Sequence, residues 1–315
     1  MYNKTMISPE SQQPERLQPI EPTEWERLCK QLEKRRALAE RVGIEVDYLI
    51  VDGAKRENTE GKGVDDVLFG ASLGKLGIAK VAIDLHLDPE AIKVWDPALR
   101  DGTGSGFYDQ ERAPHSAMIA DLVSDMLGRS GNTPLRVLSP LLGGAEAINA
   151  HYMQKGYQRT RVFPGEEGNR VFLGPTTPRE ALMMLEDIFQ GPETDLASIA
   201  QDSLRLNRIT NQGIRRSVRG TYLGIINKTG NYHGDDADPY SVAHDVGIVE
   251  SVSRKRKLKY AIMTKSPRSD RGIKSAKAAA VRLFAEWTVG RMGAEIANTV
   301  EGYRIDELGK RAMWY

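Results

Sequence analysis

The chain has 315 residues, 40% of them hydrophobic and 28% charged, which is the composition of an ordinary globular protein with a substantial core. Its formal net charge of +1 gives no global field that would attract nucleic acid or an anionic membrane. The single cysteine, Cys29, excludes an internal disulfide framework and a cysteine metal cluster. The five histidines lack a zinc-binding spacing, so we expect no metal site.

The first twenty residues are polar and rich in Pro and Gln, with no apolar signal core. Residues 1–21 are predicted to form a flexible arm ahead of one domain over residues 22–315. No apolar run approaches transmembrane length, so we expect no membrane span. Localisation stays open between the cytoplasm, as the sequence reads, and the periplasm or cell exterior if a leader was removed. The sequence leaves the oligomeric state open.

The first part of the chain reads as a helix, then strands, then further helices. Thr23 and Glu26 have the spacing of a capping box that opens the first helix. Alternating apolar residues indicate the strands, and a dense apolar pattern after Ser72 indicates a largely buried helix. In chain order we predict a helix over 23–41, strands over 44–51 and 64–69, a helix over 73–87, a glycine-rich loop over 101–106, and helices over 116–127, 134–141 and 145–155.

The last part of the chain supplies most of the predicted strands. The basic run 254–259 lies between two of them and reads as a solvated hairpin turn, so we expect no nucleic-acid partner. In chain order we predict an irregular stretch over 163–175, a helix over 177–189, strands over 222–227, 244–252 and 258–264, and a helix over 275–300. Strands at both ends and a helical middle predict an α/β (α+β) fold. One antiparallel sheet would come from about 22–70 and 205–315, with an all-helical lobe inserted over about 71–204.

The segment Ser72-Leu73-Gly74-Lys75 opens the predicted buried helix. Three residues apart, the hydroxyl and the ammonium share one helix face. A serine becomes a good nucleophile once a base removes its proton, and a lysine whose pKa is lowered by burial can be that base. Chance alone yields about one such pair in a chain of this length, so the segment needs support from elsewhere.

Two further short segments carry polar groups of the same kind. Ser130-Gly131-Asn132 could relay a proton to a leaving group and hold a substrate carbonyl, although Ser, Gly and Asn also favour turns. Lys228-Thr229-Gly230 follows a predicted strand and offers a cation and a hydroxyl to a carboxylate. Gly230 would let a ligand approach the backbone closely. The amide of Asn231 could then pair with that of Ser72 as an oxyanion hole.

Taken in order, these three segments resemble the serine β-lactamase and penicillin-binding-protein superfamily. The gaps between them suit its class A branch. Flanking features of that branch also have counterparts here, and the likeness covers roughly residues 25–300. These counterparts are the Gly-Ser-Gly loop at 104–106, the Gly-Gly step at 143–144, the Thr-Pro step at 177–178 and the strand at 244–249.

The resemblance implies a β-lactamase/transpeptidase-like fold and a role for each matching residue. Ser72 would be the nucleophile, Lys75 its proton acceptor, and Ser130, bridged to Lys228, the relay to the leaving nitrogen. The implied substrate-binding residues are Asn132, Thr229, Gly230 and Asn231, with Tyr108 either an aromatic wall of the cleft or a packed loop residue. No cofactor is implied, since hydroxyl, amine and amide groups suffice.

Two positions depart from the class A pattern. Gly131 stands where that branch usually has Asp, and we expect altered loop stiffness there rather than lost chemistry. The glutamate that hydrolyses the acyl-enzyme is followed four residues later by Asn in that branch, whereas neither Glu166 nor Glu167 has Asn at that distance. We give Glu166 the edge as the deacylating base, with a solvated loop carboxylate as the alternative.

Three hypotheses follow from these residues. The first is a serine acyl hydrolase that attacks β-lactams at Ser72. The second keeps the acyl-serine but acts on an ester or a D-alanyl peptide, or binds penicillin with slow deacylation. The third is a non-catalytic binding protein of the same fold. In the first two the partner is a small-molecule substrate.

Overall fold

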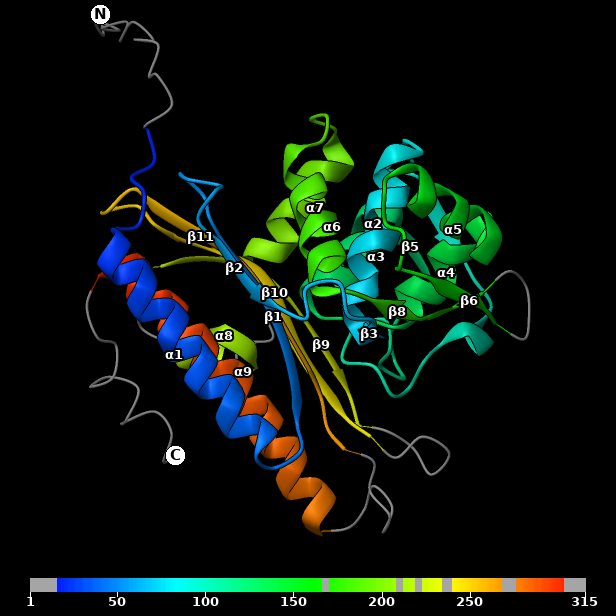
Figure 1. Cartoon of the computed structure of the whole chain (residues 1–315). Helices are drawn as coiled ribbons and strands as arrows, with labels where there is room; N and C mark the ends of the chain where they lie inside the picture. Colours follow the sequence, from blue (N-terminus) through cyan, green and yellow to red (C-terminus); the bar gives the residue numbers. More distant parts are fainter. Residues whose placement is uncertain are drawn as a thin grey trace, which may run out of the picture.

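Five antiparallel strands form the central sheet in the computed structural model of the chain, with helices on both faces (Figure 1). The structure describes residues 16–165, 170–207, 212–218, 223–233, 240–267 and 276–302. The strand order is β2-β1-β11-β10-β9, so strands from both ends of the chain lie side by side. The predicted α/β fold with an antiparallel sheet built from both termini is therefore confirmed.

The sheet strands are nearly continuously buried because both faces are covered. Along β1, Val46, Tyr48 and Ile50 enter one core, while Leu49 enters the other, as the period of two in a strand requires. The five strands are β1 (Glu45–Asp52), β2 (Thr59–Lys62), β9 (Gly224–Tyr232), β10 (Val242–Ser251) and β11 (Arg256–Lys265).

On one face lie α1 (Pro22–Glu40), α8 (Gly213–Ser217) and α9 (Ala276–Glu301), with α1 and α9 packed side by side (Figure 1). Helix α1 begins at Pro22, and its N-cap, Glu21, makes no capping bond through its side chain. The predicted capping box at Thr23 is therefore wrong, because the proline already starts the helix one residue earlier.

The expected flexible arm is described only from residue 16 onward. Within that part Ile20 is buried, and its amide donates a hydrogen bond of 2.9 Å to Asp52 Oδ2 at the end of β1. The amide of Gln18 donates to the carbonyl of Lys255 in the β10–β11 turn. The residues just before α1 are thus held against the sheet.

The helical elements between residues 71 and 205 cover the other face (Figure 1). They are η1 (Ala71–Leu73) and η2 (Pro97–Leu99), which are 3-10 turns, and the α-helices α2 (Gly74–Asp84), α3 (Ile119–Gly128), α4 (Thr133–Leu141), α5 (Gly144–Gln154), α6 (Pro178–Gln190) and α7 (Asp195–Arg205). Helix α2 has its residues buried from Gly74 to Ile83. It is the central rod of this layer, as its dense apolar pattern predicts.

Several short elements differ from the prediction. Helix α7 was not predicted, although the Thr194 hydroxyl caps it by accepting from the Ala197 amide at 3.1 Å. The stretch over 163–175, expected to be irregular, contains a small hairpin. Tertiary pairing decides such short strands, since they carry little periodicity of their own. The pairs are β3 (Leu68–Phe69) with β8 (Pro175–Thr176), β4 (Ile92–Val94) with β5 (Ser116–Met118), and β6 (Val162–Pro164) with β7 (Val171–Leu173).

The basic run 254–259 forms the β10–β11 hairpin turn and its flanks. Arg256 pairs with Glu24 of α1 at 2.9 Å, and Lys259 pairs with Glu186 of α6. These two basic residues of the run therefore form ion pairs within the chain. No helix among the described residues is both long enough and apolar enough to cross a bilayer.

Strand β1 carries a buried carboxylate, Asp47, which is 5% exposed. Gly63 covers it: a Cβ added to that glycine would lie 1.9 Å from Asp47 Oδ1. Asp47 Oδ2 has no hydrogen-bond partner within the part of the chain that the structure describes. Burial, together with the neighbouring carboxylates of Glu45 and Asp66, raises the pKa of Asp47 from 3.8 to about 7.

Asp47→Asn is expected to raise the melting temperature at pH 8 and to leave it unchanged at pH 4. Between those values the unfolded chain ionises Asp47 while the folded protein keeps it protonated, so wild-type stability falls as pH rises through this window. The gain at pH 8 should be of the order of a few kcal/mol, since each unit of pKa difference between the folded and unfolded states corresponds to about 1.4 kcal/mol. Melts of both proteins across this pH range measure it, and an equal shift at pH 4 and pH 8 would contradict the ionisation argument.

Candidate active site

The start of the buried helix α2 places a serine beside a lysine. Ser72 lies in the 3-10 turn η1, directly after Ala71, whose φ of 45° is in the left-handed region. Lys75 lies in the first turn of α2, and its Nζ donates to Ser72 Oγ at 3.2 Å. The pairing of hydroxyl and amine on one helix face is thus present.

The turn after α3 closes over the same lysine. Ser130 has a φ of 63°, and its carbonyl accepts from Lys75 Nζ at 2.6 Å. Its hydroxyl lies 3.3 Å from that nitrogen. Asn132 Oδ1 also accepts from Lys75 Nζ, at 2.6 Å. A left-handed non-glycine residue costs conformational energy, and here it turns the serine carbonyl and hydroxyl toward one amine.

Strand β9 brings a second amine to the same hydroxyl. Lys228 Nζ donates to Ser130 Oγ at 2.9 Å and to the carbonyl of Thr229 at 2.8 Å. The Ser130 hydroxyl therefore lies between two lysine amines, one from a helix and one from the sheet. The structure brings together Ser72, Lys75, Ser130, Asn132 and Lys228, which the sequence places in three distant segments.

Gly230 serves a different purpose from the one expected. A Cβ at this position would lie 3.0 Å from the carbonyl oxygen of Gly70 and 3.2 Å from the amide nitrogen of Leu73. The space beside Gly230 is therefore filled by the η1 backbone and is not left open for a ligand. This close approach of β9 to η1 sets Asn231 and Ser72 in the wall of one pocket.

That pocket has a volume of about 620 Å³. Of the residues predicted to act on substrate, Ser72, Ser130, Asn132, Thr229 and Asn231 line it. Gly104 and Ser105 of the Gly-Ser-Gly loop also lie in this wall. Other polar residues of the wall carry no motif by which the sequence could reveal them: Thr103, Gln110, Arg129, Gln212 and His233.

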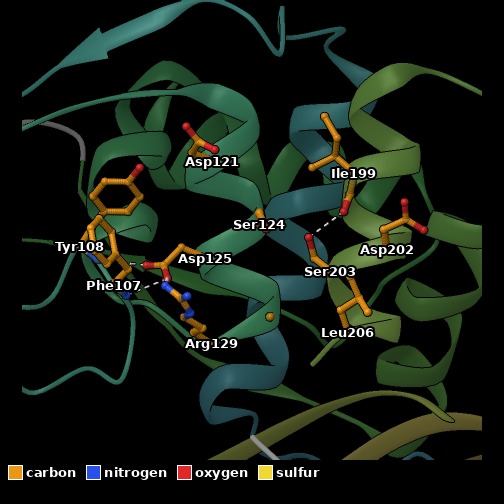
Figure 2. Close-up of a pocket in the computed structure, with 11 residues that line it drawn as sticks. Phe107, Tyr108, Asp121, Ser124, Asp125, Arg129, Ile199, Asp202, Ser203 and Leu206 are labelled. Atoms are coloured by element: carbon orange, nitrogen blue, oxygen red, sulfur yellow. Dashed lines mark hydrogen bonds and ion pairs between the residues drawn. The ribbon is translucent and has the colours of Figure 1, made fainter. Parts of the chain in front are cut away.

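Tyr108 is not among the residues that line the pocket of Ser72. It is 8% exposed and packs edge-on against Trp95 and Phe107. It lines a second hollow of about 520 Å³ between α3 and α7, shown in Figure 2, rather than the pocket of Ser72. This position fits the interpretation as a packed loop residue, and the backbone amide of Tyr108 donates to Asp125 Oδ2 of α3 at 3.3 Å.

Burial governs the charge of both lysines, which are fully buried. It lowers the pKa of Lys75 from 10.5 to about 8. Three carboxylates oppose that shift, those of Asp109, Asp101 and Asp125. Burial also lowers the pKa of Lys228 well below 10.5, and the positive charge of Lys75 lowers it further. A neutral amine beside Ser72 is therefore accessible near neutral pH.

Glu166 and Glu167 lie outside the described residues. Among the described residues that line the pocket, none carries a carboxylate. The described part of the chain also holds no group of three or more His, Cys, Asp or Glu side chains placed to bind a metal. The groups available for chemistry in this part of the site are hydroxyls, amines, amides, the guanidinium of Arg129 and the imidazole of His233.

One buried carboxylate beside the site was not foreseen. Asp109 is 4% exposed and accepts hydrogen bonds from the amides of Gly106, Asn132 and Thr133. It ties the glycine-rich loop to the turn that carries Ser130. A lone aspartate after a glycine-rich loop gives no recognisable sequence signal, because two of its three partners, the amides of Asn132 and Thr133, lie more than twenty residues away.

Comparison with known structures shows the same fold. A beta-lactamase from Sphaerobacter thermophilus matches with a TM-score of 0.67 and 19% identity, covering 86% of this chain and 97% of that one. PBP-A matches with a TM-score of 0.66 and 19% identity, covering 91% and 99%. A class A beta-lactamase from Mycobacterium abscessus matches with a TM-score of 0.67 and 16% identity, covering 86% and 99%. No curated protein sequence matches the chain significantly.

A match between the sequence and a family model shows the family of this chain. The model of the beta-lactamase enzyme family matches residues 84–288, well over half of the chain. The chain belongs to the beta-lactamase enzyme family and is a serine hydrolase of that type.

Proposed function

We propose that the protein is a serine acyl hydrolase that forms an acyl-enzyme at Ser72, with the amide of a β-lactam as its substrate. The observation that carries the proposal is the position of the Ser130 hydroxyl between the amines of Lys75 and Lys228, with Lys75 also in contact with Ser72. Such an arrangement offers a path for a proton from the attacking hydroxyl to a leaving nitrogen.

In the acylation step Ser72 Oγ forms a bond to the substrate carbonyl carbon. Its proton passes to the neutral amine of Lys75. The carbon–nitrogen bond of the substrate then breaks, and the nitrogen takes up a proton through the Ser130 hydroxyl. Water later attacks the ester, which restores the Ser72 hydroxyl and releases the carboxylic acid. No redox partner or metal enters this balance.

The other residues of the pocket suit the parts of such a substrate. The amides of Ser72 and Asn231 would stabilise the oxyanion, and Thr229 would hold the substrate carboxylate. Asn132 would bind the acyl side-chain amide. Gly230 contributes indirectly, because its missing side chain lets β9 reach η1 and so brings residues 72 and 231 together.

A second candidate function is penicillin binding, or ester or D-alanyl peptide cleavage, with a long-lived acyl-enzyme. The sequence favours it, because deacylation needs a base to activate water and neither Glu166 nor Glu167 is followed four residues later by the Asn that accompanies the deacylating glutamate in class A enzymes. A point mutant of PBP-A, another protein of this fold, is known as an acyl-enzyme complex with penicillin-G. The two candidates share Ser72 as nucleophile and differ in the substrate and in the lifetime of the acyl group.

Ser72→Ala is expected to abolish turnover of a chromogenic cephalosporin, by about 1000-fold or more, and to remove the mass adduct that penicillin leaves on the intact protein. Ser124→Ala, on the exposed side of α3, is the matched control and should behave like wild type. Labelling that survives in Ser72→Ala would refute the assignment of the nucleophile.

The rate of Ser72 acylation is expected to rise with pH and to level off above about pH 8, since the neutral form of Lys75 is the base and its pKa is about 8. At pH 7 roughly a tenth of the molecules would carry the neutral amine. Second-order rate constants for acylation between pH 6 and 10 measure this rise. A flat profile, or a midpoint near 10.5, would rule out Lys75 as the base.

Glu166→Gln is expected to leave the acylation rate unchanged and to prolong the acyl adduct about 100-fold, because a general base contributes on that scale. Glu167→Gln is the matched control, with an adduct lifetime like that of wild type. Mass spectrometry of the adduct over time reads out both variants. If the wild-type adduct itself persists for hours and neither variant changes it, the second candidate function holds.

A further inference from the structure

The helix that follows the Ser130 turn lacks the cap that its sequence would provide. Asn132 is the N-cap of α4, and Asn is among the best N-cap residues. Its side chain nevertheless makes no capping bond, because Asn132 Oδ1 accepts from Lys75 Nζ at 2.6 Å. The first amides of α4 must therefore find an acceptor elsewhere.

Asp109 supplies that acceptor from another segment. Its Oδ1 accepts from the Thr133 amide at 2.7 Å, and its Oδ2 accepts from the Asn132 amide at 3.1 Å. Oδ2 also accepts from the amide of Gly106 at 2.9 Å. A carboxylate at a helix N-terminus is favoured by the helix dipole, and this one is shielded from water.

Glycines make room for this carboxylate and for a second one, Asp125. A Cβ on Gly104 would lie 1.8 Å from Asp109 Oδ2, and a Cβ on Gly131 would lie 2.5 Å from Asp125 Oδ2. Gly131 is where class A relatives usually have Asp. In this chain the space beside residue 131 already holds a carboxylate from α3, so a side chain at 131 would collide with it.

We propose that Asp109 is a positioning residue for acylation. By accepting from the backbone amides of Asn132 and Thr133, it fixes the start of α4 in the position where the Asn132 carboxamide holds Lys75 beside Ser72. The inference rests on the proposed acyl transfer at Ser72. Asp109 touches no reacting atom, and it acts only through Asn132 and the turn that carries Ser130.

The charge of Asp109 has a separate effect on Lys75. Together with Asp101 and Asp125 it raises the pKa of Lys75 against the larger lowering by burial. Removing any of these negative charges should therefore lower the pKa of Lys75, so that the rise of the acylation rate with pH moves to lower pH. Asp101 accepts from Thr103 and pairs with Arg136, and its side chain bonds to none of the turn residues. A change at Asp101 therefore tests the effect of the negative charge on Lys75 without disturbing the hydrogen bonds that position the turn.

The test is Asp109→Asn, which keeps the size of the side chain but sets a donor against one of the three amides. The acylation rate on its high-pH plateau is expected to fall about 100-fold. Asp101→Asn should move the rise of the acylation rate to lower pH while leaving the plateau within about twofold of wild type. In an Asn132→Ala background, Asp109→Asn should cause little further loss, because both changes remove one function.

A crystal structure of Asp109→Asn gives a readout that needs no activity. The Asn132 side chain is expected to leave Lys75 and cap α4 itself. If wild type is not acylated, the proposed function fails, and the Asn132 position still decides the role of Asp109. An unmoved Asn132, a wild-type plateau rate, or additive losses in the double variant would overturn the inference. If Asp109→Asn does not melt cooperatively, Asp109→Ser, which keeps one acceptor, replaces it with the same expectations.

Discussion

The site depends on two lysine side chains buried around one serine hydroxyl. Burying an amine disfavours its charged form, and burying two together disfavours it further. Lys75 and Lys228 are both fully buried and both hydrogen-bonded, with the hydroxyl of Ser130 between them. The amines are therefore satisfied as hydrogen-bonding groups while their pKa is lowered, and the proposed transfer of the Ser72 proton to Lys75 requires this neutral amine.

The fold enforces this arrangement from three directions. Helix α2 is buried along its length and cannot move Lys75 away from the centre of the helical layer. Strand β9 is fixed by pairing with β10 and by its contact with η1 at Gly230. The turn at Ser130 is the weakest part, since its left-handed residue is strained, and the buried carboxylates of Asp109 and Asp125 hold its surroundings.

The balance between acylation and deacylation separates the possible activities of this serine hydrolase. The groups proposed for acylation all lie within the described structure: Ser72 and Ser130 line one pocket, and the amines of Lys75 and Lys228 contact the Ser130 hydroxyl. The proposed deacylating residue, Glu166, lies outside it. The likeness to beta-lactamases and to PBP-A shows the fold alone, so the lifetime of the acyl group is what distinguishes a β-lactamase from a slow acyl-enzyme in this chain.

The sequence by itself determined the main helices, four of the five strands of the central sheet and the three motif segments, because these depend on local periodicity and on residue order; strand β2 was not predicted. It did not predict helix α7, the orientation of Tyr108, the packing role of Gly230 or the capping of α4 by Asp109. Each of these is decided by contacts between residues far apart in the chain, such as the amide of residue 132 with a carboxylate 23 residues earlier. Local patterns carry no information on which distant groups will meet, so only the tertiary structure decided them.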